Sequence, residues 1–110
     1  MEYEILYCSD EVEEQILSLP DTLAARYVVL TRRMTAVGAN LGHPHTDSFG
    51  EGLFELRLKG IEGIARVFFC TLIGRKIMML HSFVKKTQKT PLREIEVARK
   101  RMKEVKHANP

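Results

Sequence analysis

Cations and hydroxyls crowd one segment near the end of the chain. The segment from His81 to Pro91 has the sequence HSFVKKTQKTP, with three lysines and two threonines within eleven residues. Lysine ammonium groups supply positive charge and threonine hydroxyls supply hydrogen bonds, which together suit a phosphate backbone. Lys85 and Lys89, with Lys86 between them, are therefore candidate contacts to a nucleic-acid backbone, although an isolated basic run more often forms only a solvated loop.

The charges are segregated along the chain. The net charge is only +3, but residues 1–56 hold three arginines against ten acidic residues, whereas residues 75–110 hold eleven cations against three acidic residues. Such a division suggests that one side of the protein faces a polyanion. The fold could also mix the two halves into one neutral surface, because charge along a chain is not charge across a surface.

Length and composition favour a single globular domain over residues 1–110. A hydrophobic content of 45% allows a modest core. No apolar run approaches the roughly 20 residues of a membrane helix, and the acidic N-terminus lacks a signal-peptide pattern. Cys8 and Cys70 lie among apolar neighbours without a zinc-type spacing, so we expect buried free thiols in a cytoplasmic protein.

The first half of the chain predicts a short strand and a hairpin of two helices. The strand is expected at residues 2–8 and the helices at residues 10–19 and 21–37, where apolar residues recur at helical spacing. Ser9 or Asp10 can cap the first helix, and Pro20 ends it. Asp21 is expected to cap the second helix, and Gly38 is expected to end it.

The second half predicts three strands and a closing helix. Residues 39–51 are rich in turn formers and are expected to form a loop. The strands are expected at residues 53–59, 64–72 and 77–84, with Gly74-Arg75 as a type II′ turn. Thr90 would cap the final helix, with Pro91 at its first position. The predicted fold is α+β and RelE-like in element order (β-α-α-β-β-β-α), with an antiparallel sheet, an N-terminal helical hairpin and a C-terminal helix.

The two turns between these strands set their register. If Gly60–Gly63 and Gly74-Arg75 are the loops, the opposite pairs are Arg57 with Arg66, Glu55 with Phe68, Phe68 with His81, and Arg66 with Phe83. Because side chains alternate across a sheet, these residues would share one face. The other face, suited to packing against helices, would hold Phe54, Leu56, Leu58, Val67, Phe69, Met78 and Leu80.

The expected pairing of Arg57 with Arg66 requires compensation, because like charges directly opposite each other destabilise a sheet. Glu55, one pair away, could supply that compensation, and a bound anion would serve equally well. Arg66 also interrupts an apolar strand, so it must be paired, stacked or bound to a ligand. With both arginines on one face and the lysines at 85–86 beside them, we favour a phosphate site.

Other residues of this face have open roles. His81 could be a hydrogen-bonded core histidine or a proton carrier that acts as base or acid. Phe68 and Phe83 could stack nucleobases or pack within the protein. Lys59 is a further candidate RNA-binding residue.

His43 and His45 flank Pro44 in the expected loop and could be taken for metal ligands. With no cysteine or third histidine nearby, a plain loop is the better interpretation, and contact with a substrate is the alternative. No metal site and no cofactor is predicted.

In this combination of motifs the chain resembles the RelE/HigB toxins of bacterial type II toxin–antitoxin systems. The resemblance is to the phage-derived, toxin-like branch of the RelE/ParE superfamily. It is carried by LFELR at 53–57, RVFF at 66–69 and the segment 81–91, followed by a basic helix with Glu94, Ala98 and Arg101. It covers about residues 3–106 in element order, and the motif at 81–91 is the specific one.

The resemblance implies a small toxin that enters the ribosomal A site and cleaves mRNA with the RNA 2′-hydroxyl as nucleophile, without a metal. It implies that Arg57 lies near the reacting phosphate and that Arg66 contacts it. It also implies that Lys86 lies on the leaving-group side, with Lys85 beside it. A cognate antitoxin, expected to be a helix-turn-helix protein, would neutralise the toxin.

The chain departs from the best-known RelE pattern at one position. The tyrosine expected after the last strand is absent, and Leu92 lies near its place. No acidic residue is an obvious base, so His81, His43 or His45 could carry the proton. The alternatives are a ParE-like toxin that acts on DNA gyrase and a non-enzymatic nucleic-acid-binding phage protein.

Overall fold

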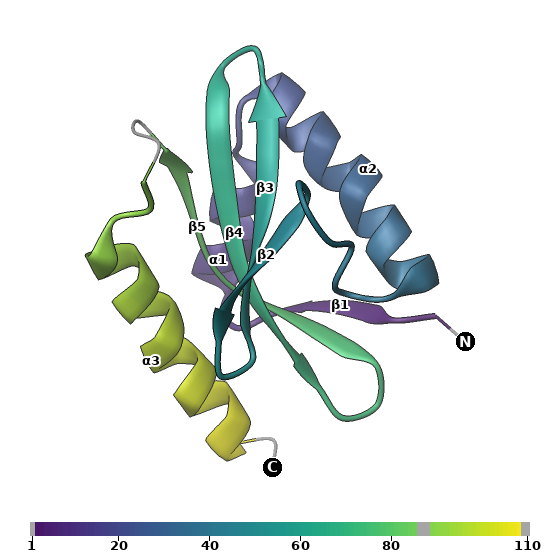
Figure 1. Ribbon diagram of the computed structural model, residues 1–110, viewed down its shortest axis with the longest axis vertical. Helices are drawn as coiled ribbons and strands as arrows, with labels where there is room; N and C mark the ends of the chain where they lie inside the picture. Colours follow the sequence, from purple (N-terminus) through teal and green to yellow (C-terminus); the bar gives the residue numbers. More distant parts are fainter. Residues whose placement is uncertain (1, 86–88, 109–110) are drawn as a thin grey trace.

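Within residues 2–85 and 89–108, which the structure describes, the computed structural model contains one five-stranded sheet covered by helices on both faces (Figure 1). The elements are β1 Glu4–Tyr7, α1 Asp10–Leu17, α2 Asp21–Val37, β2 Thr46–Gly50, β3 Leu53–Gly60, β4 Gly63–Leu72, β5 Lys76–Lys85 and α3 Leu92–Ala108. The predicted α+β class, with two N-terminal helices and a C-terminal helix, is confirmed.

The sheet is mixed, which corrects the predicted antiparallel sheet. Its strand order is β1-β5-β4-β3-β2, and β1 runs parallel to β5 whereas the other neighbours are antiparallel. The strand β2 forms within the region expected to be a loop. Thr46 pairs with Leu56 and Asp47 with Glu55. A turn-rich segment therefore forms a strand because it pairs with the edge of β3.

Local signals account for some of the helix ends. The hydroxyl of Ser9 accepts a hydrogen bond from the N–H of Val12 at 3.2 Å, which caps α1. The prediction that Asp21 caps α2 is wrong, because Asp21 is the first helical residue and Pro20 takes the cap position. Gly38 ends α2 with a φ of 117°, a conformation that favours glycine.

The predicted register around the two arginines is confirmed. The observed pairs include Arg57 with Arg66, Glu55 with Phe68, Phe68 with His81, and Arg66 with Phe83. These side chains therefore project from one face of the sheet, as alternation along each strand requires.

The turn between β4 and β5 differs from the prediction. Leu72 pairs with Lys76, so the loop has three residues, and Gly74 and Arg75 both have positive φ, at 90° and 59°. A bulge at Leu80 shifts the register, since Phe68 pairs with His81 but the next residue pairs with Met79. One extra residue moves side chains to the opposite face.

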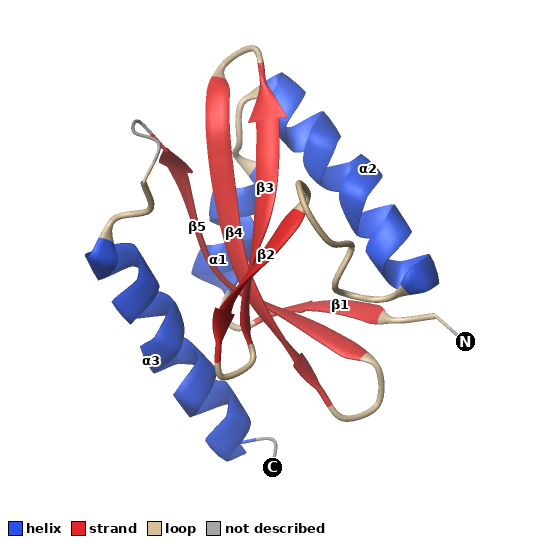
Figure 2. Cartoon of the chain, in the orientation of Figure 1, coloured by secondary structure: helices blue, strands red, loops and turns tan. Residues whose placement is uncertain are grey.

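The bulge corrects the predicted place of Met78 and Leu80, which pack against α3 and not against the N-terminal helices. Two cores result, one on each side of the sheet. The core under α1 and α2 includes Ile16, Leu23, Leu30, Leu56, Val67, Phe69 and Met79. The core under α3 includes Leu53, Phe68, Cys70, Leu80, Ala98 and Met102. Figure 2 shows α2 and α3 on opposite sides of the sheet.

Both cysteines are free, as predicted, but only Cys70 is fully buried and Cys8 is half-buried. Burial raises the pKa of each thiol, so neither favours the reactive thiolate. None of the helices in the described part of the chain has the length and apolar character needed to cross a membrane.

The turn between β3 and β4 lies directly against the start of α2. The N–H of Ile61 donates to Thr22 Oγ1 at 2.9 Å, and the Thr22 side chain also bonds to Glu62. A Cβ at Gly60 would overlap Thr22 Oγ1 and lie 3.1 Å from Leu23 Cδ2. Glycine therefore permits this approach, which fixes α2 relative to the end of β3.

Candidate nucleic-acid interface

A buried carboxylate lies at the centre of the predicted face. Glu55 on β3 is fully buried and accepts hydrogen bonds from Arg66 Nη1, from Arg57 Nε at 3.3 Å and from Thr90 Oγ1 at 3.1 Å. The structural pairing of Glu55 with the arginines is thus present. The prediction that Thr90 caps α3 is wrong, because α3 begins at Leu92 and the Thr90 hydroxyl bonds to Glu55.

The two arginines differ in depth. Arg57 is about one-third exposed, at 30% of its side chain, and its Nη2 donates to Asp47 Oδ2 at 3.0 Å. Its Nη1 lies 3.4 Å from His43 Nε2. Arg66, its partner on β4, has only 7% of its side chain exposed, and its buried Nε has no hydrogen-bond partner among the described residues. A buried donor without a partner is costly, so the bond to Glu55 leaves part of the hydrogen-bonding capacity of Arg66 unmet.

Lys85 lies on the same face, paired with Ile64 at the end of β5, and only 7% of it is exposed. Burial lowers the pKa of its ammonium, the positive charge of Arg66 lowers it further, and Glu55 partly offsets the effect. The sequence predicted a phosphate contact for Lys85. Its surroundings also make it a better proton donor than a solvated lysine.

A basic cavity of about 290 Å³ opens beside the arginine pair. We call it the basic cavity. It is lined by Arg26, Pro44, His45, Arg57, Lys59, Ile64 and Arg66. Five of these seven side chains are arginine, lysine or histidine, and none is acidic. The cavity therefore offers positive charge and hydrogen-bond donors to an anion.

Arg26 also lines the basic cavity, although no sequence motif predicted a role for it. It lies on α2, in the acidic half of the chain, and no linear pattern marks it. The close approach of α2 to the β3–β4 turn at Gly60 and Thr22 brings it to the cavity. Only the pairing of distant segments could have revealed this contribution.

His45 reaches the cavity from the segment that leads into β2. Its carbonyl accepts the N–H of Arg57 at 2.8 Å, and its own N–H donates to the carbonyl of Gly42 at 3.0 Å. Burial lowers the pKa of its imidazole, and the charges of Arg33 and Arg26 lower it further. The sequence predicted His45 only as one of three possible proton carriers. In the structure it is held beside Arg57.

The ring of His81 is engaged by two side chains of α3. Its Nε2 lies 3.0 Å from Glu94 Oε1, and Arg101 Nη1 donates to its Nδ1 at 3.2 Å. With 11% of its side chain exposed, His81 lies under α3 and does not line the basic cavity.

The aromatic candidates form a stack beneath α3. Phe68 is fully buried, and its ring centroid lies 6.0 Å from that of Phe83 and 6.4 Å from that of His81. Phe83 is half-buried and lies at the accessible end of the stack. Phe68 therefore supports Phe83, which is the better placed of the two to meet a base.

The remaining candidates are lysines. Lys59 is exposed and lines the basic cavity, and Lys89 is exposed just before α3. Lys86 lies outside the described residues. In the described part of the chain no group of three histidine, cysteine, aspartate or glutamate side chains is arranged to hold a metal ion.

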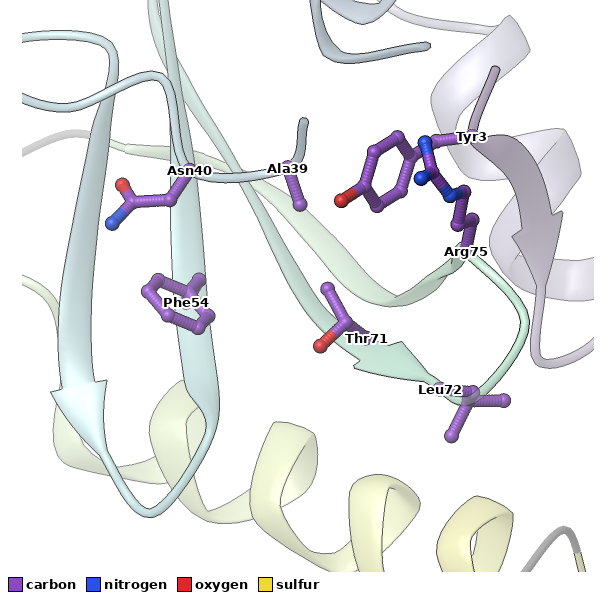
Figure 3. Close-up of a pocket in the computed structure, with 7 residues that line it drawn as sticks. All are labelled: Tyr3, Ala39, Asn40, Phe54, Thr71, Leu72 and Arg75. Atoms are coloured by element: carbon purple, nitrogen blue, oxygen red, sulfur yellow. The ribbon is translucent and has the colours of Figure 1, made fainter. Parts of the chain in front are cut away.

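A second hollow, of about 380 Å³, has a different character (Figure 3). Tyr3 and Arg75 line one side of it, with the Arg75 guanidinium 5.6 Å from the tyrosine ring centroid, and Phe54 and Asn40 line the other. It shares no lining residue with the basic cavity, and Arg75 is its only cation among the described residues.

Fold and site together define a small α+β protein with a mixed sheet and a cavity whose lining residues are mostly basic. Residues 14–103 match the family described as phage-derived proteins of the Gp49-like type. Because this match covers most of the chain, the protein belongs to the Gp49-like family, which is a family of toxin-like phage proteins. No curated protein matches the chain significantly.

Proposed function

We propose that this protein is the toxin of a type II toxin–antitoxin system and cleaves mRNA on the ribosome without a metal ion. The observation that carries the proposal is the pairing of Arg57 with Arg66 beside the basic cavity. Membership of a toxin-like family supports the same conclusion.

Charge near the arginine pair favours an anionic substrate. Arg57, Arg66 and Lys85 are opposed by the carboxylates of Glu55 and Asp47. Arg26 and Lys59 add two further positive charges in the cavity. The carboxylates thus neutralise only part of the charge, and an RNA phosphate would compensate the rest.

The chemistry proposed is attack of the RNA 2′-hydroxyl on the adjacent phosphorus. Charge then builds on the nonbridging oxygens, and the planar guanidinium groups of Arg57 and Arg66 would stabilise it. The bond from phosphorus to the 5′-oxygen breaks, and Lys85 or Lys86 would protonate the leaving oxygen. The products are a 2′,3′-cyclic phosphate and a 5′-hydroxyl.

The proposed partners follow from the family resemblance. Ribosome and mRNA would supply much of the positioning, with Lys59, Lys89 and Phe83 in contact with RNA. A cognate antitoxin, proposed to be a helix-turn-helix protein, would neutralise the toxin in the cytoplasm.

Primer extension on an mRNA in a translating extract tests the proposal. We expect cleavage by the wild-type protein and loss of at least about 100-fold in rate for Arg66→Ala, as for removal of a transition-state donor. Arg32→Ala, which removes an exposed arginine of α2 outside the cavity lining, is the matched control and should cleave normally. Thermal melting verifies that both variants fold.

Retained cleavage by a folded Arg66→Ala protein would overturn the catalytic assignment. Absence of cleavage by the wild type together with inhibition of gyrase supercoiling would favour a ParE-like toxin. Salt-sensitive RNA binding without cleavage, with or without ribosomes, would favour a non-enzymatic nucleic-acid-binding protein.

A further inference from the structure

The arginine and lysine cluster can stabilise charge, but arginine cannot accept a proton at neutral pH. We propose that His45 is the general base that accepts the proton of the RNA 2′-hydroxyl. This inference rests on the proposed function and supplies the group that its first step requires. It is carried by the position of His45 in the basic cavity with Arg57 and Arg66.

The backbone holds His45 in place from several sides. Its carbonyl accepts a hydrogen bond from the N–H of Arg57, so the two residues are neighbours just before the start of β2. Gly42 accepts the N–H groups of both His45 and Thr46, and Thr46 Oγ1 donates to Asn40 Oδ1 at 2.7 Å. A base must be held within reach of its proton, and this tied segment meets that need.

The imidazole of His45 is available for proton transfer. No hydrogen bond or ion pair engages its ring within the part of the chain that the structure describes. Because burial and the neighbouring arginines lower its pKa, the neutral ring predominates at neutral pH and can accept a proton. Half-buried, it remains open to a ligand in the cavity.

The other histidines are less suited to this role. Both ring nitrogens of His81 are engaged by Glu94 and Arg101 under α3. His43 is exposed, and its Nε2 lies 3.4 Å from Arg57 Nη1. It does not line the basic cavity. His107 lies exposed in the last turn of α3.

Both proton transfers of the proposed step use side chains of the protein. The 2′-oxygen loses its proton to a ring nitrogen of His45 and forms a bond to phosphorus, while the bond to the 5′-oxygen breaks. That oxygen takes a proton from Lys85, which leaves an imidazolium and a neutral lysine. Exchange with water then restores both groups.

The test uses ribosomes programmed with a short mRNA and measures single-turnover cleavage. His45→Gln is compared with His107→Gln, which makes the same change at an exposed position outside the site. A second mRNA carries sulfur in place of the 5′-oxygen at the scissile bond. Sulfur leaves without protonation, so this substrate bypasses the general acid but still requires the base.

We expect His45→Gln to slow cleavage of normal mRNA by at least about 100-fold, the lower range for loss of a general base. The sulfur substrate should not restore its rate, whereas it should restore much of the rate of Lys85→Met. His107→Gln should match the wild type. A His45→Gln rate within threefold of wild type, or its rescue by the sulfur substrate, would overturn the inference.

The pH dependence of the wild type gives a second measurement that does not depend on the folding of a variant. Charged or titratable groups around His45 are Arg26 and Arg33 on α2, Arg57 and Lys59 on β3, Arg66 on β4, and His43 on its own segment. Protonation of His45 abolishes its function as a base, so the rate should fall as pH decreases below the ordinary histidine value of 6.5. A rate that stays level from pH 7 to pH 4.5 would contradict the assignment.

Failure of the inference and failure of the proposed function give different results. If the wild type forms a 2′,3′-cyclic phosphate and His45→Gln does so equally fast, only the base assignment fails. If the wild type forms no such product, the proposed function fails and the inference fails with it.

Discussion

Arg57 and Arg66 face each other across β3 and β4, and both donate to the fully buried carboxylate of Glu55. The pair is thus held together by one negative charge shared between two positive ones. The same arrangement stabilises the sheet and leaves an excess of positive charge at the cavity.

Glu55→Gln should destabilise the fold strongly. It leaves the buried Arg66 without a compensating charge, and removal of one partner from a buried ion pair costs about 3–5 kcal/mol. Urea denaturation followed by circular dichroism measures the change. Asp47→Asn is the control, because Asp47 is 45% exposed and its bond to Arg57 should contribute about 1 kcal/mol or less. Similar losses for the two variants would contradict the central role of Glu55.

Lys85 should make the free energy of unfolding vary with pH in the alkaline range. Because its pKa is lowered in the folded state, the unfolded chain binds more protons between that lowered value and the ordinary value of 10.5. The free energy of unfolding contributed by this group therefore rises with pH across that window. Lys85→Met should lack this rise, and the exposed Lys100→Met should keep it, in urea denaturations from pH 7 to 10.5. Identical slopes for all three proteins would refute the prediction.

Gly60→Ala should disturb the contact between the β3–β4 turn and α2. The added methyl group meets the side chains of Thr22 and Leu23, so one segment must shift. We expect a loss of about 1–3 kcal/mol, the usual cost of overpacking. RNA affinity should fall as well, since α2 carries Arg26 to the cavity. A variant with wild-type stability would show that the turn accommodates the methyl group.

Glu94→Ala should loosen α3. Glu94 bonds to His81 at 3.0 Å, with 18% and 11% of the two side chains exposed, so a largely buried hydrogen bond is lost. Its removal should cost about 1–3 kcal/mol, and amide hydrogen exchange should accelerate in α3 more than in β4. The exposed Glu96→Ala serves as a control on the same helix. Equal exchange in the two variants would argue against an anchoring role for His81.

The proposed RNA contact should be visible in the salt dependence of binding. Arg26→Gln and Lys59→Gln each remove one cation from the cavity lining, so each should lower the slope of log K against log salt by about 0.7–0.9. Fluorescence anisotropy with a 2′-O-methyl RNA, which cannot be cleaved, measures this slope. Arg32→Gln should leave it unchanged, and an equal decrease in Arg32→Gln would indicate only diffuse attraction.

By itself the sequence determined the α+β class and the register that places Arg57 opposite Arg66 next to Glu55. Those features depend on short hairpins, in which alternation and turn residues fix which side chains meet. The resemblance of its motifs to known toxins predicted a toxin-like protein, and the match to the Gp49-like family agrees with that prediction.

The tertiary structure decided the features that depend on distant segments. A turn-rich segment pairs with the edge of β3 and forms β2, and the bulge at Leu80 places Met78 and Leu80 on the face that packs against α3. Side chains of α3 also supply the hydrogen-bond partners of His81. Arg26 and His45 join Arg57 only because α2 and the start of β2 converge on the end of β3. Such contacts depend on loop closure and packing, which no local pattern of residues encodes.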